Sequence, residues 1–269
     1  MNEEKRLYIL LGIIGAVIVL LLGLNFINEY NSKKYLEKFE NAFVSEEQQM
    51  ILLAKENCSY CQMFEPLLEH MKEKYGFEYL YINTNKLTEK ALSTVLEKLN
   101  VAEEDFGTPH LALVKSETVI DDIPGYVDEQ KLLAFLKKHG YAGENETSPI
   151  NYLTFESYKE TIKSNTPEAI VIGQESCGYC MMVKPVLLSI ADKYNVKINY
   201  LNMTELNNLE NSDEVLTEFN TSLTYLSEEE WGTPLMLVVK DNEVVGHYNG
   251  YGSEDSYVKF LKEQGIIGE

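Results

Sequence analysis

An uncharged apolar run opens the chain. It extends from Leu7 to Leu24 and contains 18 residues (LYILLGIIGAVIVLLLGL). As an α-helix this run is about 27 Å long, close to the thickness of the hydrocarbon core of a bilayer. A cleaved signal peptide would have a shorter apolar region followed by a small-residue cleavage site, and the residues after Leu24 (NFIN) offer none. We therefore favour an uncleaved membrane anchor at 7–24 over a signal peptide or a buried core helix.

Basic residues flank this run unequally. Lys5 and Arg6 directly precede it, whereas Lys33 and Lys34 follow at a distance. Basic residues beside the first hydrophobic segment favour the cytoplasmic side of the membrane. We therefore expect residues 1–6 in the cytoplasm, a linker at 25–31, and the rest of the chain outside the cytoplasm.

The remainder of the chain repeats one pattern of apolar and polar positions. YCQMFEPLLEHMKEKYGF, which begins at Tyr60, aligns with YCMMVKPVLLSIADKYNV, which begins at Tyr179. Further on, FGTPHLALVK from Phe106 aligns with WGTPLMLVVK from Trp231. A polar segment with a glycine and a proline (AGENETSPIN) separates the copies. The repeat predicts two tandem domains, at 32–141 and 152–269, with a linker at 142–151.

Both copies predict the same order of elements. Apolar residues at three-to-four spacing indicate helices, and short apolar runs between turn residues indicate strands. The order is helix, strand, helix, strand, helix, a two-stranded hairpin and a last helix, which predicts an α/β fold with a mixed central sheet flanked by helices. The first copy has these elements at 35–44, 50–54, after Cys61, 77–82, 87–99, 111–115, 119–123 and 128–139. The second has them at 152–163, 169–173, after Cys180, 196–201, 213–226, 235–240, 244–248 and 254–264.

Charge and composition narrow the class of protein. The chain has 43 acidic and 23 basic residues, a net charge of −20. This field repels a phosphate backbone, so we expect no nucleic-acid partner. Hydrophobic residues make up 45% of the chain, which excludes wholesale disorder.

All four cysteines belong to two Cys-x-x-Cys pairs, Cys58 with Cys61 and Cys177 with Cys180. Such pairs are either redox-active or, taken together, the ligands of a four-cysteine zinc site. Each pair follows a predicted strand and opens a predicted helix, where free backbone N–H groups stabilise a thiolate. This position favours redox chemistry and no metal, with the zinc site as the less favoured alternative.

Prolines strengthen the redox interpretation. A proline follows each second cysteine by five residues, at Pro66 and Pro185, and a later Thr-Pro precedes a strand in each copy. With these motifs each copy resembles a thioredoxin domain, over about residues 32–141 and 152–269. The anchor followed by such domains is also similar to bacteriocin-transport accessory proteins and membrane-anchored thiol–disulfide oxidoreductases of bacteria.

The resemblance implies a role for each matched residue. The first cysteine of each pair, Cys58 or Cys177, attacks a substrate disulfide, and the second, Cys61 or Cys180, releases the mixed disulfide. The cysteines themselves are the redox group, so no separate cofactor is expected. A cis-proline loop faces the sulfurs and binds an extended substrate segment. The residues expected to contact substrate are Tyr60, Thr108, Pro109, Tyr179, Thr233 and Pro234.

The chain departs from the thioredoxin pattern at the proton acceptor of the second cysteine. The family's buried aspartate would fall near Leu52 and Val171, and neither is acidic. Glu56 and Glu175, two residues before each first cysteine, are candidates for this proton transfer; the favoured alternative is that both are surface glutamates. His110, which follows Pro109, is expected to be an exposed histidine on a strand.

These features predict a membrane-anchored thiol–disulfide oxidoreductase whose domains lie outside the cytoplasm. Its expected partners are protein or peptide thiols and disulfides, the membrane, and a membrane redox partner or exporter. Reductase, oxidase and isomerase use the same residues, so the direction of electron flow stays open. The alternative is an accessory subunit of a peptide (bacteriocin) exporter that uses the folds mainly to bind cargo.

Overall fold

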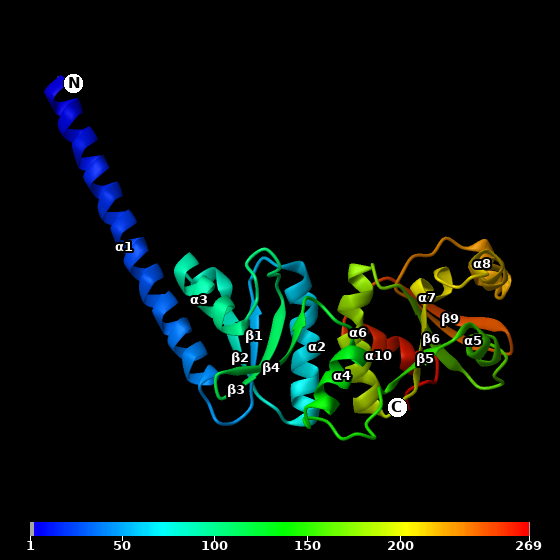
Figure 1. Cartoon of the computed structure of the whole chain (residues 1–269). Helices are drawn as coiled ribbons and strands as arrows, with labels where there is room; N and C mark the ends of the chain where they lie inside the picture. Colours follow the sequence, from blue (N-terminus) through cyan, green and yellow to red (C-terminus); the bar gives the residue numbers. More distant parts are fainter. Residues whose placement is uncertain (1–2, 269) are drawn as a thin grey trace. The chain divides into compact units, whose positions relative to one another are not determined.

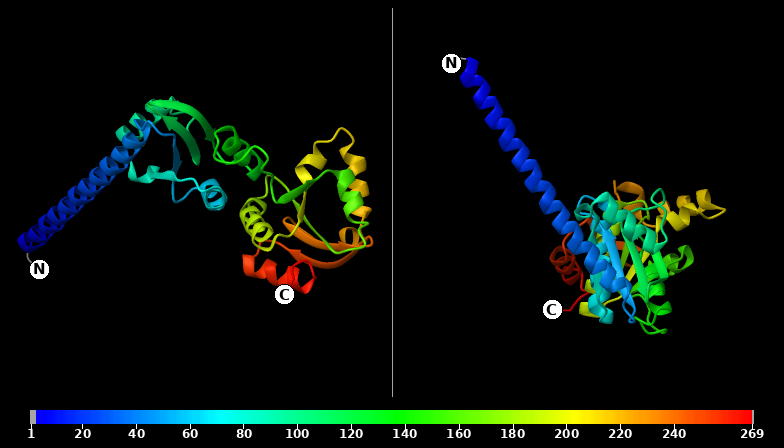
Figure 2. Two further views of the ribbon diagram at one scale, coloured as in Figure 1. Left: turned by 90° about the horizontal axis from the view of Figure 1, so that it is seen from below. Right: turned by 60° about the vertical axis from the view of Figure 1, so that its left-hand side comes forward.

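The computed structural model describes residues 3–268, and the side chains of Lys5 and Arg6, the predicted orientation signal, lie outside the described residues. Its first element, α1, is one continuous helix from Glu3 to Phe43 (Figures 1 and 2). The segment 25–31, predicted as a linker, is therefore helical. No glycine or proline interrupts the chain between Leu24 and Phe43, so nothing breaks the helix there.

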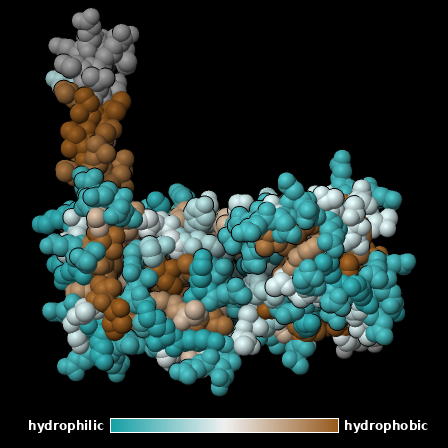
Figure 3. All heavy atoms as spheres, turned by 45° about the vertical axis from the view of Figure 1, so that its right-hand side comes forward, coloured by the Kyte–Doolittle hydropathy of each residue, from teal (hydrophilic) through white to brown (hydrophobic). Residues whose placement is uncertain are grey.

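The apolar part of α1 does not pack against the rest of the described chain. From Leu11 to Leu24 its side chains are exposed and form a continuous hydrophobic surface (Figure 3). The helix is long and apolar enough to cross a membrane. Its last turns differ, because Phe39 and Phe43 are buried in a hydrophobic core. One helix thus combines a span that fits an anchor with an amphipathic end that belongs to a folded unit.

The chain divides into two compact units. One comprises Met1–Phe64 and Phe77–Val127, and the other comprises Glu65–Gly76 and Asp128–Glu269. This division assigns the later turns of α2 (Ser59–Tyr75) and all of α4 (Glu129–Lys138) to the second unit. The predicted domain limits, 32–141 and 152–269, follow the sequence repeat instead and stay a prediction.

The first unit contains a mixed four-stranded sheet in the order β2-β1-β3-β4. The strands are β1 (Gln49–Ala54), β2 (Tyr79–Asn83), β3 (His110–Lys115) and β4 (Thr118–Pro124). β1 runs parallel to β2 and antiparallel to β3. The end of α1 and helix α3 (Glu89–Leu99), which follows the short 3₁₀ helix η1 (Thr84–Lys86), bury one face of this sheet.

The second unit contains a mixed five-stranded sheet in the order β5-β7-β6-β8-β9. The strands are β5 (Ile150–Leu153), β6 (Glu168–Gly173), β7 (Ile198–Asn202), β8 (Leu235–Lys240) and β9 (Glu243–Asn249). β6 lies parallel to β7 and antiparallel to β8, as β1 lies to β2 and β3. The α/β fold class with mixed sheets is therefore confirmed.

Two helix predictions in the second copy are wrong. The helix expected at 152–163 is shortened to α5 (Phe155–Thr161), because the chain before it forms strand β5. β5 pairs with β7, more than forty residues away, and no pattern in the local sequence predicts this pairing. The helix expected at 213–226 is divided, and the region has α7 (Met203–Asn207), α8 (Ser212–Thr221) and α9 (Thr224–Glu228).

Each cysteine pair lies at the start of a long helix, α2 or α6 (Gly178–Tyr194), that contains a proline. A final helix, α10 (Glu254–Glu263), packs against α6. The strand before each helix, β1 or β6, is central in its sheet and almost fully buried. The end of a buried strand thereby fixes where the chain turns into the helix and presents the first cysteine.

Candidate active site

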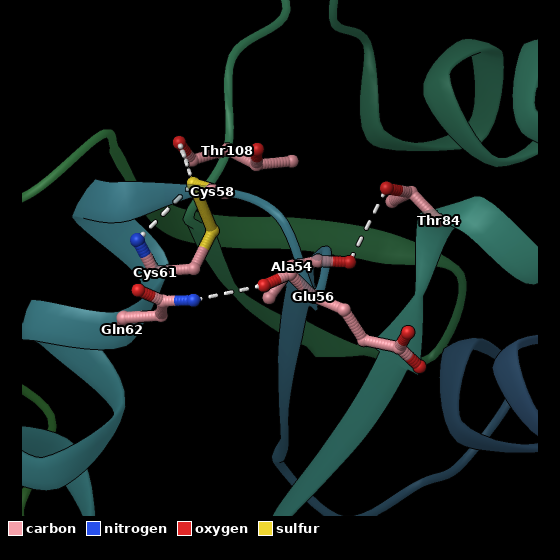
Figure 4. Close-up of a disulfide and its surroundings, with 7 residues drawn as sticks. All are labelled: Ala54, Glu56, Cys58, Cys61, Gln62, Thr84 and Thr108. Carbon is pink, nitrogen blue, oxygen red and sulfur yellow. Dashed lines mark hydrogen bonds between the residues drawn. A yellow bond between two sulfur atoms is a disulfide. The ribbon is translucent and has the colours of Figure 1, made fainter.

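The first site consists of Cys58, Cys61, Thr108 and Pro109. Cys58 and Cys61 form a disulfide, with their Cα atoms 5.2 Å apart (Figure 4). The Cys61 backbone N–H donates a hydrogen bond to Cys58 Sγ over 3.1 Å. The Thr108–Pro109 peptide bond is cis, and the Thr108 carbonyl oxygen lies 3.1 Å from Cys58 Sγ. Cys58 therefore has the helix N-terminus on one side and the proline loop on the other.

The second site consists of Cys177, Cys180, Thr233 and Pro234, and its backbone has the same arrangement. The Cys180 N–H donates to Cys177 Sγ over 3.2 Å, and the Cys177 thiol donates to the Thr233 carbonyl over 3.3 Å. The Thr233–Pro234 bond is also cis. In both sites a glycine N–H, Gly125 or Gly250, donates over 2.8 Å to the carbonyl of the cis-proline.

The two cysteines of the second site differ in accessibility. Both are free thiols; Cys177 is partly exposed, and Cys180 is buried. Burial raises the pKa of the Cys180 thiol to about 12, because the low-dielectric interior disfavours its thiolate. Cys177 is therefore the more accessible sulfur of this pair, and the Cys180 thiol keeps its proton at neutral pH.

The two CxxC tyrosines have different surroundings. Tyr60 and Tyr179 are both exposed, as expected for side chains available to a substrate. Tyr179 stacks on Tyr251 with ring centroids 6.3 Å apart. In the first site the equivalent of Tyr251 is Tyr126, which packs edge-on against Phe64 instead. The place of Tyr251 beside the site was not predicted; the signal that could have found it is the dipeptide that the copies share at Gly125-Tyr126 and Gly250-Tyr251.

Each of the two glutamates accepts a hydrogen bond from an asparagine at the end of a neighbouring strand. Asn83 Nδ2 donates to Glu56 Oε1 over 3.0 Å, and Asn202 Nδ2 donates to Glu175 Oε1 over 3.2 Å. Figure 4 shows the Glu56 carboxylate directed away from the sulfurs. Its side chain is 63% exposed. Proton transfer by these glutamates stays a prediction, and the geometry favours the alternative of surface residues.

His110 is buried, so the expectation of an exposed strand histidine is wrong. It is only 2% exposed, because β3 lies between β1 and β4. Its Nε2 lies 3.0 Å from a carboxylate oxygen of Asp122 on β4. Burial lowers the pKa of His110, with the opposing influence of Asp122 smaller. The second copy has Leu235 at this position.

Metal ligands are not gathered in the part of the chain that the structure describes. Among residues 3–268, no cluster of three or more histidine, cysteine, aspartate and glutamate side chains has a geometry that would hold a metal ion. In the first site the two sulfurs bond to each other.

Sequence and structure comparisons agree with this geometry. Residues 36–140 match the model of the thioredoxin-like domain family. A disulfide bond formation protein of Brevibacillus choshinensis is 29% identical over 94 residues, which are 35% of this chain and 75% of that protein.

Two thioredoxin structures are similar to parts of the chain. Thioredoxin NaTrxh from Nicotiana alata is 19% identical, covers 46% of this chain and 98% of its own, and has a TM-score of 0.34. Thioredoxin f2 from Chlamydomonas reinhardtii is 11% identical, covers 44% and 99%, and also has a TM-score of 0.34. The match at 36–140, the mixed sheet and the cysteine pair opposite a cis-proline identify this part of the chain as a thioredoxin-like domain.

Proposed function

We propose that the chain is a membrane-anchored thiol–disulfide oxidoreductase with two active sites, which acts outside the cytoplasm on disulfides or thiols of exported proteins or peptides. The observation that carries the proposal is the repeated geometry of the sites. In each, the first cysteine lies between a helix N-terminus and a cis-proline loop, and the second is buried one turn further on. The disulfide bond formation protein of B. choshinensis supports the same chemistry.

The first step breaks the substrate disulfide. The thiolate of Cys58 or Cys177 attacks one substrate sulfur, a mixed disulfide forms, and the other substrate sulfur leaves as a thiolate. Backbone N–H groups at the start of α2 or α6 stabilise the attacking thiolate, and the N–H of the second cysteine already points at the sulfur.

The second step releases the product. Cys61 or Cys180 loses its proton, its sulfur attacks the first cysteine, and the remaining substrate sulfur leaves as a thiolate. Two electrons pass from the enzyme dithiol to the substrate disulfide, and the cysteine pair ends as a disulfide. The same steps in reverse oxidise a substrate dithiol. No cofactor beyond the cysteines takes part.

Substrate is held beside the first cysteine. The residue before each cis-proline, Thr108 or Thr233, places its backbone next to the sulfur and offers it to an extended peptide. The exposed rings of Tyr60 and Tyr179 flank the same cysteines and supply apolar contacts.

The test is to trap the mixed disulfide. Full-length chains with Cys61→Ser or Cys180→Ser lack the second thiol at the changed site and should accumulate covalent adducts there; chains with Cys58→Ser or Cys177→Ser should not. Cells are quenched with acid, alkylated and analysed on non-reducing gels. Adducts on the first-cysteine variants would reverse the assignment of roles. No adducts on any variant, with bound zinc in the parent chain, would exclude the redox function.

The same cells test the location. A membrane-impermeant maleimide, applied to intact cells after mild reduction, should label the first cysteines. Labelling only after lysis would place both sites in the cytoplasm and favour a cytosolic reductase. Adducts formed mainly with components of a peptide exporter would favour the accessory-subunit alternative.

A further inference from the structure

A buried lysine lies one helical turn after the second cysteine of the second site. Lys184 and Cys180 are both on α6, four residues apart, and both are buried. Residues four apart lie on the same face of a helix, and their side chains lean towards its N-terminus. The Lys184 side chain therefore extends back along α6 towards the turn that holds Cys180. Lysines are rarely buried without a specific partner.

The Lys184 amine lies over the faces of two tyrosine rings. Nζ lies 4.9 Å from the ring centroid of Tyr200 on β7 and 5.2 Å from that of Tyr152 on β5. Tyr200 is the register partner of Val171 on β6, so both side chains lie on the same face of the sheet. Val171 is the position at which the thioredoxin pattern would have its buried aspartate. The amine thus lies beside the place where the usual proton acceptor is missing.

Tyr200 is held in this place by its neighbours. Its hydroxyl fills the space directly over Gly173, where any larger residue would collide with it. Tyr152 donates from its hydroxyl to Glu129 Oε2 over 3.2 Å, and Glu129 is fully buried. The two tyrosine rings that contact Lys184 are therefore held in place, which limits the positions that its amine can reach.

Several acidic groups face Lys184 from the elements around it. They are Asp128 and Glu129 at the start of α4, Glu175 in the loop before α6, and Cys180 on α6 itself. Burial lowers the pKa of Lys184, and burial raises the pKa of Glu129 as it does that of Cys180. All three shifts favour the neutral forms. A proton that moves from Cys180 to Lys184 creates an ion pair inside the protein, which costs less than one isolated buried charge.

We propose that Lys184 is the base that accepts the Cys180 proton at the second site. The inference rests on the proposed oxidoreductase function. The Cys180 S–H bond breaks and its proton forms an N–H bond on the Lys184 amine. The Cys180 thiolate then attacks Cys177 Sγ and expels the substrate thiolate, which takes up the proton from Lys184 directly or through water. The acid missing at Val171 is thereby replaced by an amine from the helix.

The experiment isolates the second site in the full-length protein in detergent micelles. Cys58→Ala and Cys61→Ala silence the first site. The reduced protein is mixed rapidly with dithiobis-nitrobenzoate, an aryl disulfide that releases a coloured thiolate. The first release reports attack by Cys177, and the second reports resolution by Cys180.

Lys184→Met keeps the length of the side chain and removes the amine. It should slow the second release about a hundredfold near neutral pH and leave the first within about twofold. The slowed release should recover as the pH rises, because hydroxide then removes the Cys180 proton. Lys184→Arg should also slow the second release, since a guanidinium stays protonated and accepts nothing. Lys193→Met, an exposed lysine on the same helix, is the matched control and should change neither release.

The outcomes separate the two hypotheses. If the first release is absent in the parent chain, the proposed function fails at this site. If the first release is normal and the second is unchanged in both Lys184 variants, the role of Lys184 is overturned and the proposed function stands. If Lys184→Met does not fold, Lys184→Arg, which keeps a long side chain with an apolar stem and a nitrogen-containing head, decides the result.

Discussion

The two candidate sites have the same arrangement of backbone groups and differ in the side chains around them. In both, the second cysteine's N–H meets the first sulfur and a threonine carbonyl lies opposite. Around the first site, Tyr126 packs on Phe64, and His110, the residue after the cis-proline, is buried. Around the second, Tyr251 stacks on Tyr179, which lies between the two cysteines in the sequence.

The buried polar groups also differ. Position 184 is a buried lysine, whereas its counterpart in the first copy is Glu65. The position of His110 is Leu235 in the second copy. Duplication therefore retained the contacts that place the sulfurs, and the buried polar and aromatic residues around them changed. We expect the two sites to share a mechanism and to differ in rate, pH dependence and substrate preference.

The largest difference should come from the cores beneath the two sites. Phe64→Ala removes a fully buried ring and its contact with Tyr126, and should lower the free energy of unfolding of the first unit by about 3–5 kcal/mol. Val183→Ala, the matched change, removes two methyl groups and should cost about 2 kcal/mol.

Urea unfolding of the full chain in detergent measures both changes. Far-UV circular dichroism follows both units, whereas the fluorescence of the single tryptophan, Trp231, follows the second. Phe64→Ala should shift only the circular dichroism transition, and Val183→Ala should shift the Trp231 fluorescence transition. An equal shift of the Trp231 transition by Phe64→Ala would mean that the units do not unfold independently.

A smaller difference should appear on acidification. Because burial lowers the pKa of His110 below its ordinary value of 6.5, the unfolded chain binds this proton more readily than the folded one. Stability from this group is therefore complete above pH 6.5 and is lost as the pH falls below it, by at most about 1.4 kcal/mol per pH unit.

His110→Leu copies the residue of the second site and should reduce this slope. The measurement is the free energy of unfolding from urea titrations on both sides of that pKa. The Trp231 transition is the internal control, since Leu235 already occupies the equivalent position. A slope that His110→Leu leaves unchanged would show that the histidine does not titrate differently on folding.

The smallest effect should come from the glutamates before each first cysteine. Glu56→Gln and Glu175→Gln keep the size of the side chains, and the Asn83 and Asn202 amides still find an acceptor. Resolution by the second cysteine should change by less than about twofold, measured as the second thiolate release from the aryl disulfide. A loss of about a hundredfold in either site would restore the glutamate as its proton acceptor.

Much of the site could be predicted from the sequence because its motifs are local. Strand, Cys-x-x-Cys and helix are consecutive in the chain, so the turn that presents Cys58 or Cys177 follows from their order. The Thr-Pro dipeptides were found through the resemblance to thioredoxin, and the structure confirms their cis bonds and their place beside the sulfurs. The residues that were missed act across the sheet, where spacing along the chain carries no information.

The sequence by itself determined the duplication, the apolar helix, the mixed α/β class and the cysteine pairs, since each depends on residues near in the chain. The tertiary structure alone decided that β5 joins β7, that His110 is buried and that Lys184 lies on Tyr152 and Tyr200. The physical reason is that burial depends on which distant segments cover a residue. A histidine or a lysine looks like a surface residue in the sequence, and its protonation is set only when other elements exclude water from it.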